Sequence, residues 1–376
     1  MIILVLVVSA ILIVVGSYIA SCVAEGLQYH YSDTLIAGFI ALLQTLPEYA
    51  FIIILTLAGH FDYALMSIVG ANILLVALGF PVIVFIGYIS KVRGIRKDKS
   101  LDLLRENSVE SIFLAISGVY MVYLGLKGDI DIVDGVVLLI VFVVYMFIIT
   151  HLPPEVEEEE PKKLARFFAE RKKIGLVAII VGAIVIWYSA EVFTEGILEF
   201  SKQYVGSAII LVTVLMPLVS EFPEKLTAYI GAARNEDMAR LGVANFMSSR
   251  INNGTLLFSS MMLTLYLAHG GTVVSLHTAD FPMLPKLMIM AGILSLLGAL
   301  TTIDRRITVM ESIALFLVYI VLMYSLIHLE FLVYADMLMV IILAIILGYA
   351  LKDRRFFWWS DLTYTLRELK FRKANQ

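Results

Sequence analysis

Five ionisable residues lie within long apolar stretches of this sequence: Glu48, Glu221, Glu224, Lys225 and Arg250. If those stretches cross a membrane, each charge costs at least about 2.5–3.5 kcal/mol at a helix centre unless it is paired or hydrated. Charged residues in that environment usually line a cavity or an ion pathway. We therefore expect these five residues to mark an ion site, and the competing interpretation is a buried pair that only fixes helix packing.

Oxygen-bearing side chains accompany these charges at helical spacing. Gln44 and Glu48 are four residues apart on one helix face, with Thr45 beside them, and Glu221 shares a face with Glu224. Glu221 also stands four residues before Lys225, a favourable order for an ion pair. A polar stripe next to Arg250 adds amides and hydroxyls: Asn245, Ser249, Asn252 and Asn253. Three prolines free backbone carbonyls from the helix ladder: Pro47, Pro217 and Pro223. Such oxygens are ligands for hard cations such as Ca²⁺ and Na⁺.

The composition places these groups in a membrane protein. Of the 376 residues, 60% are hydrophobic and 16% are charged, and the mean hydropathy is +0.92. Because soluble domains are about half apolar and a quarter charged, a soluble enzyme, a secreted disulfide scaffold and a nucleic-acid binder are excluded. The single cysteine, Cys22, cannot form an internal disulfide and is expected to be a small buried hydrophobe. The expected partners are the lipid bilayer and inorganic cations, with no nucleic acid and no bound cofactor.

The apolar stretches predict an all-α fold with eleven membrane-spanning helices. They are too uniformly apolar for the alternating strands of a barrel. The first stretch lacks the basic start and the cleavage site of a signal peptide, so we expect it to be retained. The predicted spans are roughly 1–23, 34–58, 62–89, 108–127, 132–150, 174–200, 204–231, 240–267, 284–303, 308–328 and 331–351.

Basic residues predict the orientation in the cell membrane. With the N-terminus outside and the C-terminus in the cytoplasm, most of the 28 Lys and Arg residues fall in cytoplasmic segments. The outer loops then contain only Lys127, Lys202 and Lys286. The opposite orientation would reverse this bias, so the arrangement with the N-terminus outside is favoured.

Four short similarities indicate an internal repeat. Each joins a segment of the first half to one of the second, in the same order: Glu25–Leu27 with Glu195–Ile197, Leu46–Glu48 with Phe222–Glu224, Gly70–Ile73 with Ser248–Ile251, and Ile130–Gly135 with Ile307–Ser312. Corresponding units start five spans apart, an odd number, so the halves are expected to be inverted in the membrane. The prediction is ten helices in two inverted five-helix repeats, plus an eleventh helix.

The repeat also predicts the domain organisation. The first repeat is 1–150 and the second is 174–328, separated by a charged linker at 151–173 and followed by the extra helix at 329–351. The linker contains a glutamate run for which calcium sensing is the alternative to a solvated connection. The tail at 352–376 combines aromatic and basic residues and is expected to lie at the cytoplasmic membrane surface.

The motifs resemble those of the cation/Ca²⁺ exchanger superfamily, which contains sodium/calcium and proton/calcium antiporters. That family has two inverted repeats, each with a G-T-S-L-P-E-like motif on one helix and a G-N-x-x-G-S-N-I motif on the next. Gln44–Glu48 resembles the first motif and Ser67–Ile73 the second. The counterparts in the second half are Ser220–Glu224 and Asn245–Ile251, and Pro217–Ala228 is also similar to the proton/calcium branch.

The resemblance implies a mechanism and a ligand set. Glu48 and Glu224 would be the paired metal-ligating carboxylates for Ca²⁺, competing with Na⁺ or H⁺ as the counter-ion. The resemblance also implies Thr45, Ser220 and Asn72 as ligands. The polar residues Glu221, Ser249 and Asn245 complete the expected ion-binding set, although Glu221 stands where the family has a small hydroxyl residue. Gln44, Lys225 and Arg250 would modulate the site. Alternating access would come from sliding of the first and sixth spans.

Arg250 departs from the family pattern, because the family has Asn or Asp at this position. A guanidinium near the carboxylates would repel Ca²⁺. Three interpretations remain open: a salt bridge that breaks during transport, a side chain that points away from the site, or a divergent branch with another substrate.

The leading hypothesis is therefore secondary antiport of Ca²⁺ or another cation against Na⁺ or H⁺. The alternative is a divergent exchanger-fold protein with a salt-bridged site, which moves a different ion or acts as a non-transporting membrane sensor. An enzyme is not expected, since the sequence has no HExxH motif, no Gly-x-Ser-x-Gly elbow and no Gly-rich phosphate loop.

Overall fold

A computed structural model describes residues 2–28, 45–104, 107–149, 163–203, 210–278, 281–328 and 331–353. Gln44, most of the predicted linker and the aromatic tail lie outside these residues. The chain divides into two compact units, one made of Met1–Ser67 with Val156–Lys225 and the other of Ile68–Glu155 with Leu226–Gln376.

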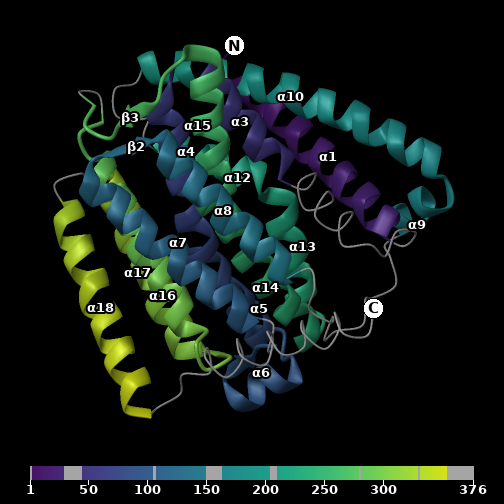
Figure 1. Cartoon of the computed structure of the whole chain (residues 1–376). Coiled ribbons are helices and arrows are strands. Elements are labelled where there is room, and N and C mark those ends of the chain that lie inside the picture. The colour runs from purple at the N-terminus through teal and green to yellow at the C-terminus, as the bar shows by residue number, and fades with distance from the viewer. Residues whose placement is uncertain are drawn as a thin grey trace, which may run out of the picture. The chain divides into compact units, whose positions relative to one another are not determined.

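The first unit is built from helices, and the predicted seventh span is interrupted in it near the predicted site. Its elements are α1 (Ile2–Gln28), α3 (Leu46–Leu57), the start of α4 (Phe61–Ile73), α9 (Lys163–Glu170), α10 (Lys172–Gln203), the π-helix η2 (Leu211–Leu215), α12 (Met216–Ser220) and the start of α13 (Phe222–Ala232). The long helices α1 and α10 run side by side (Figure 1). They approach closely where Gly16 faces α10, since a Cβ there would lie 2.9 Å from Cγ1 of Ile186.

The second unit contains the remaining helices and four short strands. Its elements are the end of α4, the π-helix η1 (Leu74–Gly79), α5 (Phe80–Ile89), α6 (Arg93–Asp98), β1 (Ser100–Asp102), α7 (Asn107–Lys127), β2 (Asp129–Asp131), α8 (Ile132–Ile149), the end of α13, α14 (Glu236–Gly254), α15 (Leu256–His269), β3 (Val273–Ser275), α16 (Leu284–Thr301), β4 (Arg306–Thr308), α17 (Val309–Ile327) and α18 (Leu332–Asp353). Helix α7 packs along α16, and α18 packs against α16 and α17.

Seven helices of the described residues are long and apolar enough to cross a membrane. They coincide with the predicted spans one, three, four, five, six, nine and ten, and the multi-pass helical prediction is confirmed to that extent. In the apolar 18-residue stretch of Phe61–Ile89, 83% of the residues are buried, whereas in that of Ile132–Ile149 only 22% are buried. Phe61–Ile89 therefore belongs to the protein interior, and Ile132–Ile149 presents a surface suited to lipid.

Two predicted spans are interrupted rather than continuous. The seventh changes from α12 to α13 at Glu221, where Pro223 follows and cannot donate a helix hydrogen bond. The predicted span 240–267 divides at Thr255, whose φ of −131° and ψ of −78° are outside the helical region. The two asparagines and the glycine before it are poor helix formers, which explains why the break falls there.

The strands are a departure from the purely helical prediction. Each has three residues, too few for a recognisable alternating pattern. β1 pairs antiparallel with β4, and β2 pairs antiparallel with β3. Both pairs join a strand of the predicted first repeat to a strand of the second.

The crossing of α7 and α16 depends on two glycines. A Cβ on Gly292 would lie 2.6 Å from the carbonyl oxygen of Gly118 and 2.8 Å from the backbone nitrogen of Val122. Since backbone cannot yield as a side chain can, we expect Gly292→Ala to destabilise the protein by about 1–3 kcal/mol, the usual cost of overpacking. Thermal unfolding of the purified protein in detergent should show a lower Tm.

Gly182→Ala on α10 is the matched control for this experiment. Its Cβ would meet only the carbonyl oxygen of Gly16 at 3.8 Å, an ordinary van der Waals distance. Equal Tm values for the two variants would show that the α7–α16 crossing tolerates a methyl group.

Candidate functional site

Two helices of the first unit begin in the same way, each with a Pro-Glu pair in its first turn. Before α3, Thr45 has φ −94° and ψ 13°, and before α13, Glu221 has φ −93° and ψ 0°. Both conformations lie in the sparsely occupied bridge region of the backbone map. The prolines suit a first helical turn, because the missing N–H has no partner there anyway. Glu48 and Glu224 therefore stand at the positive ends of two helices, where a carboxylate is favoured.

Glu48 is buried beside other charges. Its side chain is 5% exposed, and its Oε2 atom has no hydrogen-bond partner among the described residues. It interacts electrostatically with Glu221, Glu224 and Lys225, all of the same unit. A buried carboxylate that has two other carboxylates near it and one oxygen unbonded is disfavoured in its charged form unless a cation or a proton joins it.

The predicted pair of Glu221 and Lys225 is confirmed. The ammonium of Lys225 donates to Oε2 of Glu221 across one helical turn, and both side chains are almost completely buried. Next to this pair, the Ser220 hydroxyl donates to the carbonyl of Pro217 at 3.2 Å, which leaves its oxygen lone pairs available. Thr45 is buried at the equivalent bend of the other helix.

Two threonines of the first unit were not predicted. Thr213 in η2 and Thr194 in α10 are 1% and 2% exposed, and neither hydroxyl has a hydrogen-bond partner among the described residues. A hydroxyl usually bonds back to the carbonyl four residues earlier in a helix, so these two are exceptions. The sequence does contain one signal for Thr213, because this residue stands four positions before Pro217. Proline has no N–H to donate to the Thr213 carbonyl, and a π-helix forms at this place.

In the second unit, the two predicted second-motif residues contact one sulfur atom. The amide of Asn72 and the guanidinium of Arg250 both approach Sδ of Met121 on α7, at 3.9 Å and 3.0 Å. Arg250 also donates to the carbonyl of Ala291 at 3.2 Å and to the hydroxyl of Ser295, both on α16. This completely buried guanidinium therefore ties α14 to α7 and α16.

The remaining predicted ligands differ in exposure. Ser249 is buried, and its hydroxyl has no partner in the described part of the chain. Asn245 is exposed, unlike the rest of the predicted set. Asn72 is fully buried with an unbonded Oδ1 within the described ranges. Gln44 lies outside the described residues.

An acidic cluster elsewhere in the second unit is paired with a lysine side chain. Asp129, Asp131 and Asp134 could hold a metal by spacing, but the ammonium of Lys127 lies 2.9, 2.6 and 2.7 Å from their carboxylates. The hydrogen bond from Lys127 lowers the pKa of Asp131 below its usual value. This cluster is therefore a structural ion-pair network at the start of α8.

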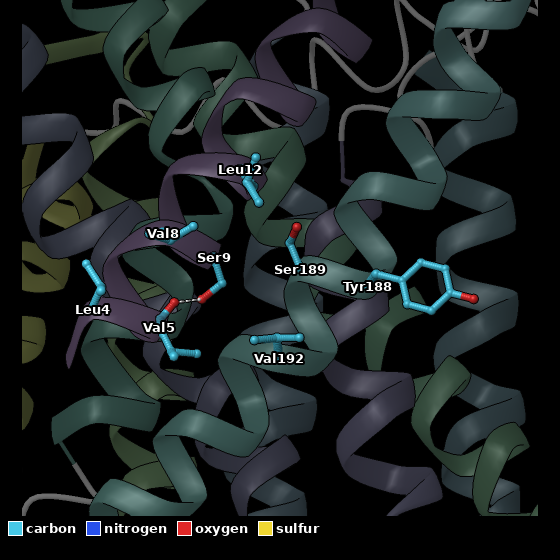
Figure 2. A pocket seen from close by; sticks show the side chains of 8 residues that line it. All are labelled: Leu4, Val5, Val8, Ser9, Leu12, Tyr188, Ser189 and Val192. Atoms are coloured by element: carbon cyan, nitrogen blue, oxygen red, sulfur yellow. Dashed lines mark hydrogen bonds between the residues drawn. The ribbon is translucent and has the colours of Figure 1, made fainter. Parts of the chain in front are cut away.

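A groove of about 420 Å³ lies between α1 and α10 of the first unit. Figure 2 shows that most of its lining is aliphatic and that the Tyr188 ring points away from α1. The hydroxyl of Ser9 donates to the carbonyl of Val5 at 2.7 Å. The full lining is Leu4, Val5, Val8, Ser9, Leu12, Tyr188, Ser189 and Val192. A groove of this chemistry suits hydrocarbon and offers little to an ion.

The sequence profile of the sodium/calcium exchanger protein family matches residues 1–151 and 174–328. The chain belongs to this family. Exchangers of this family are secondary transporters rather than enzymes, and the apolar helices agree with a multi-pass membrane protein for inorganic cations.

Solved structures show the same fold at low identity. The chain is similar to an H⁺/Ca²⁺ exchanger, CAX, with a TM-score of 0.85 and 22% identity, over 98% of this chain and 92% of that one. It is similar to the sodium-calcium exchanger NCX_Mj with a TM-score of 0.56 and 21% identity, over 86% of this chain and 99% of that one. A search of curated proteins found no match.

Proposed function

We propose that the chain is a secondary antiporter that exchanges Ca²⁺, or another cation, against Na⁺ or H⁺ at a carboxylate site within the membrane. Glu48 and Glu224 are the metal-ligating residues of this proposal. Ser220, Thr45 and Glu221 supply further oxygens from the first unit, and Asn72, Asn245 and Ser249 are the family-implied ligands of the second. The observation that carries the proposal is the buried Glu48 carboxylate, which interacts with Glu221 and Glu224 and has an unbonded oxygen among the described residues.

The charge of the site supports a divalent ion. Two helix N-termini each present one carboxylate of a Pro-Glu pair, and a neutral complex forms when two carboxylates bind one divalent cation. The fold of CAX, described as an H⁺/Ca²⁺ exchanger, is the more similar of the two solved structures described above, which supports protons as the counter-ion.

The proposed architecture is ten helices in two inverted repeats plus α18. The strand pairing supports it, since a two-fold axis that exchanges the repeats would convert β1 into β3 and β4 into β2, and so each pair into the other. The matching backbone angles at Thr45 and Glu221 support it at the site. The domains proposed are therefore 1–150 and 174–328, joined by a linker, with the N-terminus outside and the C-terminus in the cytoplasm.

Alternating access is proposed to come from sliding of α1 and α10, the first and sixth spans. These helices contact each other at glycines, and the groove between them is lined mostly by aliphatic side chains. Sliding of the helices would therefore break few polar contacts. Cation and counter-ion would compete for the same carboxylates, which face each side in turn.

Transport by the full chain in proteoliposomes tests the proposal. We expect uptake of radioactive Ca²⁺ when an outward gradient of H⁺ or Na⁺ is imposed, and no uptake without a gradient. Ion binding without gradient-driven flux would favour the non-transporting sensor. No flux of Ca²⁺, Mg²⁺, Mn²⁺ or K⁺ under either gradient would contradict the antiporter.

A further inference from the structure

The starts of α3 and α13 have uncharged side chains in one helix where the other has charged ones. At the first, the N–H of Tyr49 donates to the carbonyl of Thr45 at 3.3 Å, and at the second, the N–H of Lys225 donates to the carbonyl of Glu221 at 3.0 Å. Thr45 thus corresponds to Glu221, and Tyr49 corresponds to Lys225. A neutral pair in one half is replaced by an anion and a cation in the other.

Stability does not explain this charged pair. Both side chains are buried, 3% exposed for Lys225 and 0% for Glu221, so each has lost nearly all of its hydration. A buried ion pair of this kind is often no more stabilising than uncharged residues of the same size. The first half makes the same helix start with an uncharged pair, so the fold itself does not need the two charges.

The charges of the cluster suggest what the pair does. The first unit brings together the carboxylates of Glu48, Glu221 and Glu224 with the ammonium of Lys225. Lys225 neutralises Glu221, and the two remaining carboxylates match one divalent cation. Without the ammonium, the charge of the buried Glu221 carboxylate would be uncompensated and would attract an additional monovalent cation such as Na⁺.

We propose that the Lys225 ammonium is a built-in monovalent cation that occupies Glu221 and so makes transport of the divalent ion independent of Na⁺. Lys225 is a specificity-determining residue in this proposal, which rests on the antiport proposed above. A tethered ammonium remains at Glu221 through every transport cycle. A Na⁺ ion in the same position would be exchanged with the solution and would change the net charge carried across the membrane in each cycle.

Two single variants and their combination test the proposal in proteoliposomes under a proton gradient, at constant ionic strength with choline replacing Na⁺. For the wild-type chain, we expect Ca²⁺ uptake to be unaffected by Na⁺. Lys225→Met exposes the Glu221 charge, so Na⁺ should now raise the apparent KM for Ca²⁺ by about tenfold. Glu221→Gln leaves the ammonium without its anion and should raise this KM about tenfold at every Na⁺ concentration.

The double variant Glu221→Gln with Lys225→Met is the matched control. It removes both charges, so its KM for Ca²⁺ should again be independent of Na⁺, whatever the absolute KM after the loss of the Glu221 carboxylate. A pair with only a structural role would not give this reversal of the Na⁺ sensitivity of Lys225→Met. The proposal would be overturned by wild-type uptake that Na⁺ inhibits, by a Lys225→Met variant that Na⁺ does not affect, or by a double variant that Na⁺ inhibits. If Lys225→Met does not fold, an unchanged KM in Glu221→Gln would overturn it. Absence of wild-type uptake would instead contradict the antiport itself.

Discussion

Glu48→Gln should reduce Ca²⁺ uptake in proteoliposomes to the level of empty vesicles. Glutamine has nearly the same shape as glutamate but no charge, and the Glu48 carboxylate is buried with one oxygen unbonded among the described residues. Losing one of the two carboxylates would leave a bound divalent ion with an excess positive charge in a medium of low dielectric constant. Because Glu224 stands at the equivalent helix start, we expect Glu224→Gln to have the same effect.

Glu199→Gln is the matched control for these two variants. Glu199 lies on α10 of the same unit, but its side chain is exposed. We expect it to transport like the wild-type chain, and all three variants should elute as folded protein in size-exclusion chromatography. If Glu48→Gln retained half of the wild-type uptake, the proposed ion site would be wrong.

Arg250 is completely buried and occupies a position where the family motif implies an ion ligand. On the proposal that its guanidinium acts on the bound cation, Arg250→Asn should raise the apparent affinity for Ca²⁺ by about tenfold, since like charges repel strongly in a medium of low dielectric constant. The substitution also installs the residue type implied by the family motif. Folding should survive, since the hydroxyl of Ser295 donates to the carbonyl of Ala291 at 2.6 Å and keeps that acceptor satisfied. Uptake measured over a range of Ca²⁺ concentrations gives the affinity.

Arg250→Lys separates charge from geometry. Lysine keeps the positive charge but lacks the planar fork, so we expect a Ca²⁺ affinity close to that of the wild-type chain. If Arg250→Asn abolished the uptake of every cation while remaining folded, Arg250 would be part of the transport mechanism rather than a residue that weakens Ca²⁺ binding.

The local features of the site were predictable from the sequence. Leu46–Glu48 and Phe222–Glu224 identify equivalent helix starts, and the backbone angles at Thr45 and Glu221 agree with that equivalence. The spacing of Glu221 and Lys225 predicts an ion pair that the structure contains. These features depend on residues three or four positions apart, a distance over which helix geometry alone determines which side chains meet.

Other features depend on residues far apart in the chain. Arg250 meets Met121 and Ser295 because three helices pack together, and β1 meets β4 across more than half of the sequence. The helix break at Thr255 depends on the packing of α14 and α15 as well as on the two asparagines and the glycine before it, which form helix poorly. Apolar periodicity contains no information on which helices become neighbours.

By itself, the sequence determined a multi-pass helical exchanger with a repeated Pro-Glu helix start, because hydropathy, proline and helical spacing act locally. Only the tertiary structure decided that Glu48 is buried among the charges of Glu221, Glu224 and Lys225, and that Arg250 contacts α7 and α16. The physical reason is that the cost of a buried charge depends on the distance to every other charge, and those distances are set by packing.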